Sequence, residues 1–237
     1  WYFVGLQELL VYFDPWIAGV VMPGLIIVGL MAIPYIDTNP KGVGSYAWKE
    51  RPFANTLFML GIVMWFALIY IGYACRGPNY AWYWPWESWL MTKPAPPPTW
   101  SVFGPKGVAM FPMWLGIPLM GAVSGAWLLG PKLIQKELDG MKTMGAFLGL
   151  LTALGVVGMV MGKMGVVELG FMLFLAGASF YYGFVLPQRH IRTLDWPRYM
   201  VTMVLVVSTM SVLLKMLARL TFNIKYVLTI PSISMNF

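Results

Sequence analysis

Acidic side chains are scarce in this chain of 237 residues, nine in all, and two of them stand where proton chemistry is conceivable. Glu8 and Asp14 follow an aromatic start, Trp1, Tyr2 and Phe3, and precede a long apolar run. The stretch that holds them reads as a short amphipathic segment at a membrane edge, where a carboxylate beside aromatic rings can take up a proton and pass it on. A surface helix whose polar face meets water is the alternative, and the pattern leaves both open.

Three other side chains could do chemistry. His190, the single histidine, lies in a basic stretch that favours contact with water or lipid headgroups, although histidine–methionine ligation of a haem is chemically feasible. Cys75 ends an apolar run and is either a small interfacial hydrophobe or a point of haem attachment or metal binding. Glu168 is either a proton-path carboxylate inside a span or a structural group near a helix N-terminus. One histidine and one cysteine allow neither a bis-histidine haem site nor a disulfide within the chain, and we predict no metal site.

The composition places these residues in a membrane protein. Hydrophobic residues make up 59% of the chain, charged residues 11%, and the mean hydropathy is +0.71, whereas soluble domains are about a quarter charged. Six apolar stretches reach the roughly 20 residues that a helix needs to cross a bilayer. They are continuously apolar, which indicates helices rather than a barrel. We therefore predict an all-α, polytopic helical membrane protein with about six transmembrane helices, near 16–36, 53–74, 108–130, 143–162, 166–186 and 199–217.

The basic residues give an orientation. The net charge is +7, but Lys and Arg are spread between apolar runs, which argues against nucleic-acid binding. Nine of them fall in short loops on one face and seven on the other, so the first face is predicted to be cytoplasmic. The N-terminal segment and the C-terminus then lie on the outer side. Lys215 and Arg219, one helical turn apart near that side, are expected to extend to the headgroups.

The chain changes character between its second and third predicted spans. Residues 76–107 form a long outer loop that is first rich in aromatic residues, as at a membrane interface, and then rich in proline, as in a stiff linker. We expect three parts: a two-span unit over residues 1–75, the loop over 76–107, and a four-helix membrane extension over 108–237.

Several fragments in the first 90 residues resemble one family. Trp1-Tyr2-Phe3 resembles the end of the Pro-Glu-Trp-Tyr-Phe motif in the C-terminal half of cytochrome b, which is a separate chain, subunit IV, in the cytochrome b6f complex. The chain begins after the Pro and Glu, so we expect them in sequence upstream. Further fragments occur in the family's order, with spans between them, and two resemble bacterial relatives; they are Ile33–Asp37, Arg51–Ala54, Arg76–Asn79 and Trp84–Glu87. Residues beyond about 90 match nothing in the family.

The resemblance implies a subunit of a quinol:cytochrome c oxidoreductase, not catalytic alone, in a bacterial inner membrane. Trp1, Tyr2 and Phe3 would bind quinol in a pocket on the periplasmic side, with residues 76–107 on the same side. The b haems would belong to the N-terminal half of cytochrome b, and a Rieske iron–sulfur protein and a cytochrome c-type subunit would complete a dimeric complex. The proton acceptor would be the upstream Glu, with Glu8 as a substitute. A transporter subunit and a non-catalytic membrane anchor are the alternatives.

Overall fold

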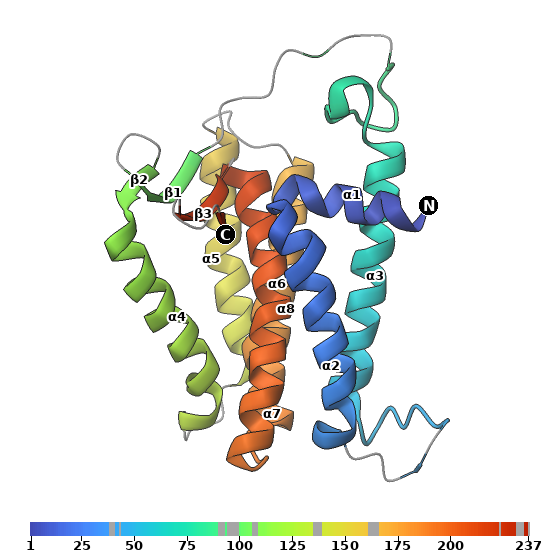
Figure 1. Ribbon diagram of the computed structural model, residues 1–237, viewed down its shortest axis with the longest axis vertical. Coiled ribbons are helices and arrows are strands. Elements are labelled where there is room, and N and C mark those ends of the chain that lie inside the picture. Colours follow the sequence, from blue (N-terminus) through green and yellow to red (C-terminus); the bar gives the residue numbers. More distant parts are fainter. Residues whose placement is uncertain are drawn as a thin grey trace.

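The protein is a bundle of upright helices with one helix lying across its end (Figure 1). The computed structural model describes residues 1–37, 41–42, 44–89, 93, 100–105, 109–134, 139–160, 166–222, 224–230 and 235–236. Helix α1 (Tyr2–Tyr12) is the crosswise element. The same end of the bundle as α1 also holds the turn that follows the helix Pro52–Ala74, the small sheet and the C-terminal strands. The predicted topology requires this arrangement.

Four helices among the described residues are long and apolar enough to cross a membrane. The first runs from a π-helical turn, η1 (Ile17–Val21), into α2 (Met22–Ile36); the others are α3 (Pro52–Ala74), α4 (Met113–Leu133) and α8 (Trp196–Phe222), of which Trp196–Leu220 is the apolar part. Length and composition thus confirm a helical membrane protein. The spans predicted at 16–36, 53–74 and 199–217 correspond closely to three of these helices.

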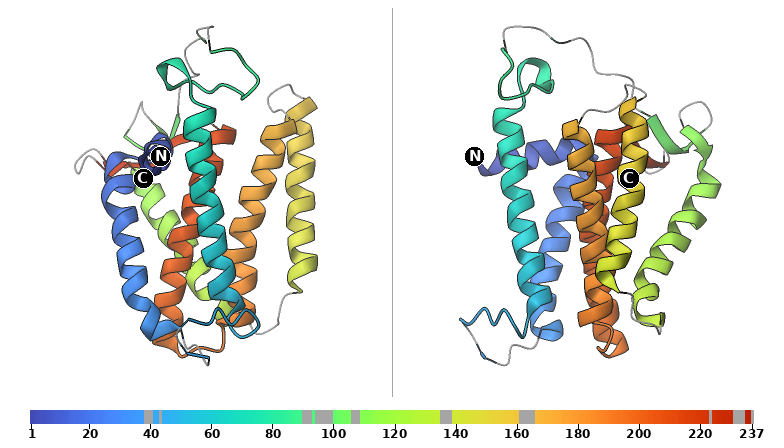
Figure 2. Two further views of the ribbon diagram at one scale, coloured as in Figure 1. Left: turned by 90° about the vertical axis from the view of Figure 1, so that its right-hand side faces the viewer. Right: turned by 180° about the vertical axis from the view of Figure 1, so that it is seen from behind.

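Two further predicted spans are also helical. Helix α5 (Gly140–Val160) stands beside α6 (Val166–Phe180), which continues through a π-helical turn, η3 (Tyr181–Val185), into α7 (Leu186–His190) (Figure 2). The apolar part of α5, Lys142–Val157, is shorter than a full span. Four spans are therefore supported by length and composition, and six stays a prediction.

A small sheet that was not predicted lies at the α1 end. It has the strand order β2-β1-β3-β4, with β1 parallel to β2 and β3, and β3 antiparallel to β4. The strands are β1 (Trp100–Gly104), β2 (Ala109–Pro112), β3 (Ile224–Ile230) and β4 (Met235–Asn236). The third span consequently begins at Met113 and not at 108. Pairing of Ser101 with Tyr226 joins segments far apart in the chain, which local hydrophobic patterns do not reveal.

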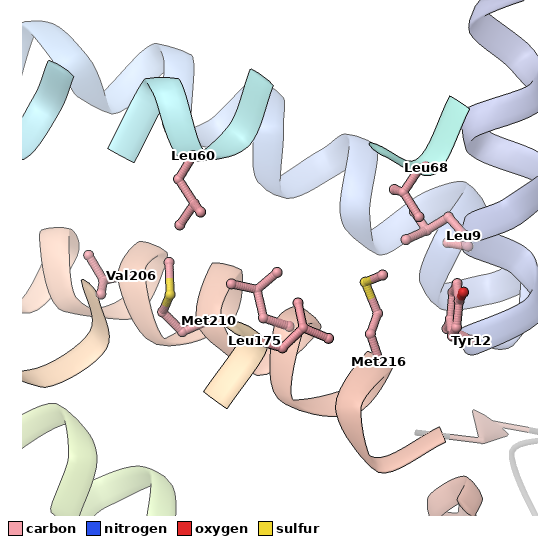
Figure 3. Packing of buried hydrophobic residues seen from close by; sticks show 10 residues of the cluster. Leu9, Tyr12, Leu60, Leu68, Leu175, Val206, Met210 and Met216 are labelled. Carbon is pink, nitrogen blue, oxygen red and sulfur yellow. The ribbon is translucent and has the colours of Figure 1, made fainter. Parts of the chain in front are cut away.

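The core gathers around α8. Buried side chains from α1, α3, α6 and α8 form one cluster (Figure 3). Its labelled members are Leu9, Tyr12, Leu60, Leu68, Leu175, Val206, Met210 and Met216. The first 75 residues and the C-terminal helices thus share one core. The predicted division of the chain into three parts at residues 75 and 107 stays a prediction. It does not describe how the helices pack.

Helices α1 and α3 cross closely because glycines line the contact. A Cβ atom on Gly72 of α3 would stand 2.6 Å from Cγ1 and 3.1 Å from the carbonyl oxygen of Val4 on α1. On the α1 side, a Cβ on Gly5 would stand 3.0 Å from Cγ1 of Ile69. Small residues let helix backbones approach in a membrane, and here they seat the crosswise helix against a span.

Replacing Gly72 by Ala should therefore separate the two helices. We expect Gly72→Ala to lower the free energy of unfolding by about 1–3 kcal/mol through overpacking against the Val4 backbone. Gly61→Ala is the matched control, because Gly61 lies on the same helix and a Cβ there meets nothing within 4 Å. Unfolding by a denaturing detergent measures both, and equal midpoints for the two variants would contradict the close crossing.

Candidate functional site

Helix α1 ends where the sequence forces a turn. Phe13 is extended, with φ −126° and ψ 155°, and Asp14 precedes Pro15, which disfavours helical geometry at Asp14. The backbone N–H of Trp16 donates to Oδ1 of Asp14 at 3.1 Å. Asp14 thereby supports the start of the next helix, and the chain turns from the crosswise α1 into the upright η1 and α2.

A buried polar network fixes the inner face of α1. Arg76, just past the end of α3, donates from Nε to Oε2 of Glu8 at 2.9 Å and from Nη2 to Oε1 at 2.6 Å. The Tyr12 hydroxyl donates to Oε1 of the same carboxylate at 2.8 Å. Glu8 is 0% exposed. A bidentate arginine–carboxylate pair of this kind combines charge with fixed geometry, so it sets both the position and the rotation of α1.

The surroundings of the pair keep it intact. The Arg76 guanidinium carbon lies 5.2 Å from the centre of the Tyr80 ring and 5.3 Å from that of Trp82, within the range of cation–π attraction. Burial raises the pKa of the Tyr12 phenol far above its ordinary value, and the negative charge of Glu8 raises it further. The phenol therefore keeps its proton and remains a hydrogen-bond donor to Glu8 throughout the physiological range.

The start of the chain, at the N-terminal end of α1, carries an open aromatic edge. Trp1, Tyr2 and Phe3 are 79%, 53% and 71% exposed, and neighbouring rings contact edge to face. The Tyr2 ring lies against Trp65 of α3, with 5.1 Å between ring centroids. Nε1 of Trp65 is buried and has no hydrogen-bond partner among the described residues. The exposed ring faces are suited to a flat, apolar ligand, whereas the buried indole N–H is closed to one.

The structure brings together only part of the predicted site. Helix α1 and the residue before it carry Trp1, Tyr2, Phe3 and Glu8. The Glu8 side chain is buried, whereas the three aromatic side chains are exposed. The water-facing surface helix that was the alternative for Glu8 is therefore wrong for this residue. The proton path through Glu8 and Asp14 stays a prediction, because Asp14 lies beyond the helix in a separate turn.

The other candidates lie elsewhere. His190 is exposed at the end of α7, at the opposite end of the bundle from α1 (Figure 1). Cys75 is buried at the C-cap of α3, next to Arg76. The side chain of Glu168 lies outside the described residues. Among the residues that are described, no three His, Cys, Asp or Glu side chains gather as a metal site would require.

Sequence reasoning missed Arg76, Tyr12 and Trp65. The pairing of Glu8 with Arg76 had a usable signal, since the predicted topology placed both on the outer side, where an unpaired charge near the bilayer needs a partner. Tyr12 follows from the helical spacing of four residues from Glu8. Nothing in the sequence distinguishes Trp65 from the other tryptophans.

At the opposite end, two of the family-like fragments contact one another. Nε of Arg51 donates to Oδ1 of Asp37 at 2.9 Å, and the two side chains form an ion pair. Nδ2 of Asn55 donates to the Tyr46 carbonyl oxygen at 2.6 Å. These bonds join the end of α2 to the start of α3 across their connecting loop.

Comparisons with protein-family models, with curated proteins and with solved structures gave no match for the chain.

The buried pair can be tested by a double-mutant cycle. Removing one partner of a buried ion pair costs about 3–5 kcal/mol because the other charge is left uncompensated, so we expect losses of this size in unfolding free energy for Glu8→Gln and Arg76→Gln. The double variant should lose clearly less than the sum. Glu50→Gln is the control, since Glu50 pairs with Lys41 on the surface at 3.0 Å and should lose less than about 1 kcal/mol. Strictly additive losses would show that Glu8 and Arg76 act independently.

Proposed function

We propose that this chain is a membrane subunit of a quinol:cytochrome c oxidoreductase of the cytochrome bc type, and that its α1 edge forms one wall of the outer-face quinol-oxidation pocket. The observation that carries the proposal is the exposed aromatic edge, Trp1 to Phe3, which the buried Glu8–Arg76 pair holds in place. The resemblance of five ordered fragments in residues 1–90 to the C-terminal half of cytochrome b supports it.

Each group at the edge has a definite task in this proposal. The Tyr2 and Phe3 rings offer apolar faces to the quinol ring, and Trp65 packs against Tyr2 and holds its ring in place. Oxidation of the quinol releases two electrons and two protons. The Rieske protein and the b haems of the N-terminal half of cytochrome b would accept the electrons, because this chain has one histidine.

Glu8 is not free to act as the proton acceptor. Both Glu8 carboxylate oxygens already accept hydrogen bonds, Oε1 from Arg76 and Tyr12 and Oε2 from Arg76. A base must be free to reach the proton that it removes. In the proposed site Glu8 is therefore a positioning residue, and another base receives the proton.

A membrane anchor without a catalytic role is the second candidate. Only 6% of the residues in the apolar window are buried in Ile17–Ile36 and likewise in Met113–Leu133, so the rest of the chain covers few side chains of these two spans completely. These faces are available to lipid or to neighbouring subunits such as the N-terminal half of cytochrome b, a cytochrome c-type subunit, or a second complex in a dimer. The aromatic edge has no task in a pure anchor, and that difference can be measured.

Substitutions at the edge separate the two candidates. In the purified complex, Tyr2→Ala should slow quinol oxidation about tenfold and leave the haem spectra unchanged, because a wall of the pocket is removed but no haem ligand. Trp114→Phe, at a tryptophan 73% exposed on α4, should change neither the rate nor the spectra. Unchanged turnover in Tyr2→Ala would leave the anchor as the better description.

The sidedness of the site can be tested at Cys75. This thiol is 4% exposed and burial raises its pKa, so a membrane-impermeant maleimide should label it very slowly in the folded protein. After unfolding in place, labelling should succeed from the periplasmic side of intact cells. Labelling from the cytoplasmic side alone would place α1 and its edge on the inner face and rule out an outer quinol site.

A further inference from the structure

The last turns of α8 hold two cationic side chains, of which Lys215 is hydrogen-bonded and Arg219 is not. Lys215 is 7% exposed, and its ammonium donates to the carbonyl oxygens of Ile224 at 3.4 Å and Lys225 at 2.5 Å. It does not extend to the headgroups as predicted but supports the first residues of β3. Arg219, one turn further on, makes no hydrogen bond or ion pair with any described residue, and its Nη1 atom is fully buried.

The charge around Arg219 is unbalanced. Its guanidinium lies close enough to Arg76 and to Lys215 to interact with both, and each interaction is repulsive. Glu8 neutralises Arg76 and is already fully engaged with it and with Tyr12. The described groups that interact with Arg219 are therefore two cations and the phenols of Tyr12 and Tyr226, with no carboxylate among them. A partly buried arginine without an acceptor is costly, and such groups in native proteins usually have a partner outside the chain.

We propose that Arg219, backed by Lys215 and Arg76, binds the phosphate group of an anionic phospholipid of the outer leaflet. Arg219 as a whole is only partly buried, so the N–H donors of Nε and Nη2 form the fork offered to two phosphate oxygens, and a phosphate would offset the excess positive charge. The depth is suitable as well, because Arg219 lies in the last turn of the apolar stretch Trp196–Leu220, where headgroups meet the hydrocarbon. This site goes beyond the proposed quinol chemistry and does not depend on it.

Lipid add-back to the purified protein, with its accompanying subunits and in a neutral detergent, tests the site. We expect native mass spectrometry to show phosphatidylglycerol bound far more tightly than phosphatidylcholine, and the affinity for phosphatidylglycerol to fall at least about tenfold in Arg219→Gln. Arg219→Lys, which keeps the charge and loses the planar fork, should fall between the two. Arg189→Gln is the matched control, because Arg189 is an exposed arginine at the opposite end of the bundle. Equal losses in Arg219→Gln and Arg189→Gln would overturn the proposal.

Thermal stability gives a second readout, because the difference in melting temperature between Arg219→Gln and the wild type should change sign when lipid is added. Without lipid, Arg219→Gln should melt at or above the temperature of the wild type, because an unpaired charge is removed. With phosphatidylglycerol it should melt about 2–4 °C below the wild type, because the variant gains less from the lipid. Destabilisation in both conditions would show that Arg219 has a partner within the protein and would overturn the proposal. Equal protection of the wild type by inorganic phosphate would overturn the assignment to a lipid.

Discussion

The bidentate pair between Glu8 and Arg76 is the constraint on which the α1 end of the molecule depends. It joins the crosswise helix α1 to the residue that follows α3, across 68 positions of the chain. The same arginine pairs with Trp82 in an isolated β-bridge, while Tyr83 N–H donates to the Cys75 carbonyl oxygen at 2.9 Å, so the loop folds back over the helix end. One interaction thus orients the aromatic edge, the loop and the cations near α8.

The membrane explains why polar contacts have this weight. Lipid is as apolar as the helices, so burial of apolar surface does not by itself distinguish one arrangement of spans from another. Close packing, as at Gly72, and satisfied polar groups must supply the specificity. The buried pair ties α1 to the end of α3, and the Arg51–Asp37 pair ties the end of α2 to the start of α3. Side chains of α8 pack into the core that α1 and α3 share.

The sequence predicted those features that depend only on neighbouring residues. A continuously apolar run at 53–74 between Pro52 and Cys75 predicted α3 almost to the residue, because span length and helix breakers are read from neighbouring positions. The sheet could not be found in this way, since β1 and β3 pair across more than half the chain. The predicted role of Lys215 was wrong for the same reason, because the two carbonyl oxygens that accept its hydrogen bonds belong to a strand that was not predicted.

The family-like fragments occupy the corners of the fold, and this limits what each can say about function. Ile33–Asp37 contacts Arg51–Ala54 through an ion pair, and Arg76 within Arg76–Asn79 holds Glu8. Glu87 of Trp84–Glu87 pairs with Lys93. Span interiors can exchange one apolar residue for another, whereas helix ends need particular partners, so corners keep a recognisable pattern whatever the protein does. Trp1-Tyr2-Phe3 differs from them, because it fills no corner and leaves its rings exposed. The case for quinol oxidation therefore rests on that edge and not on the number of matching fragments.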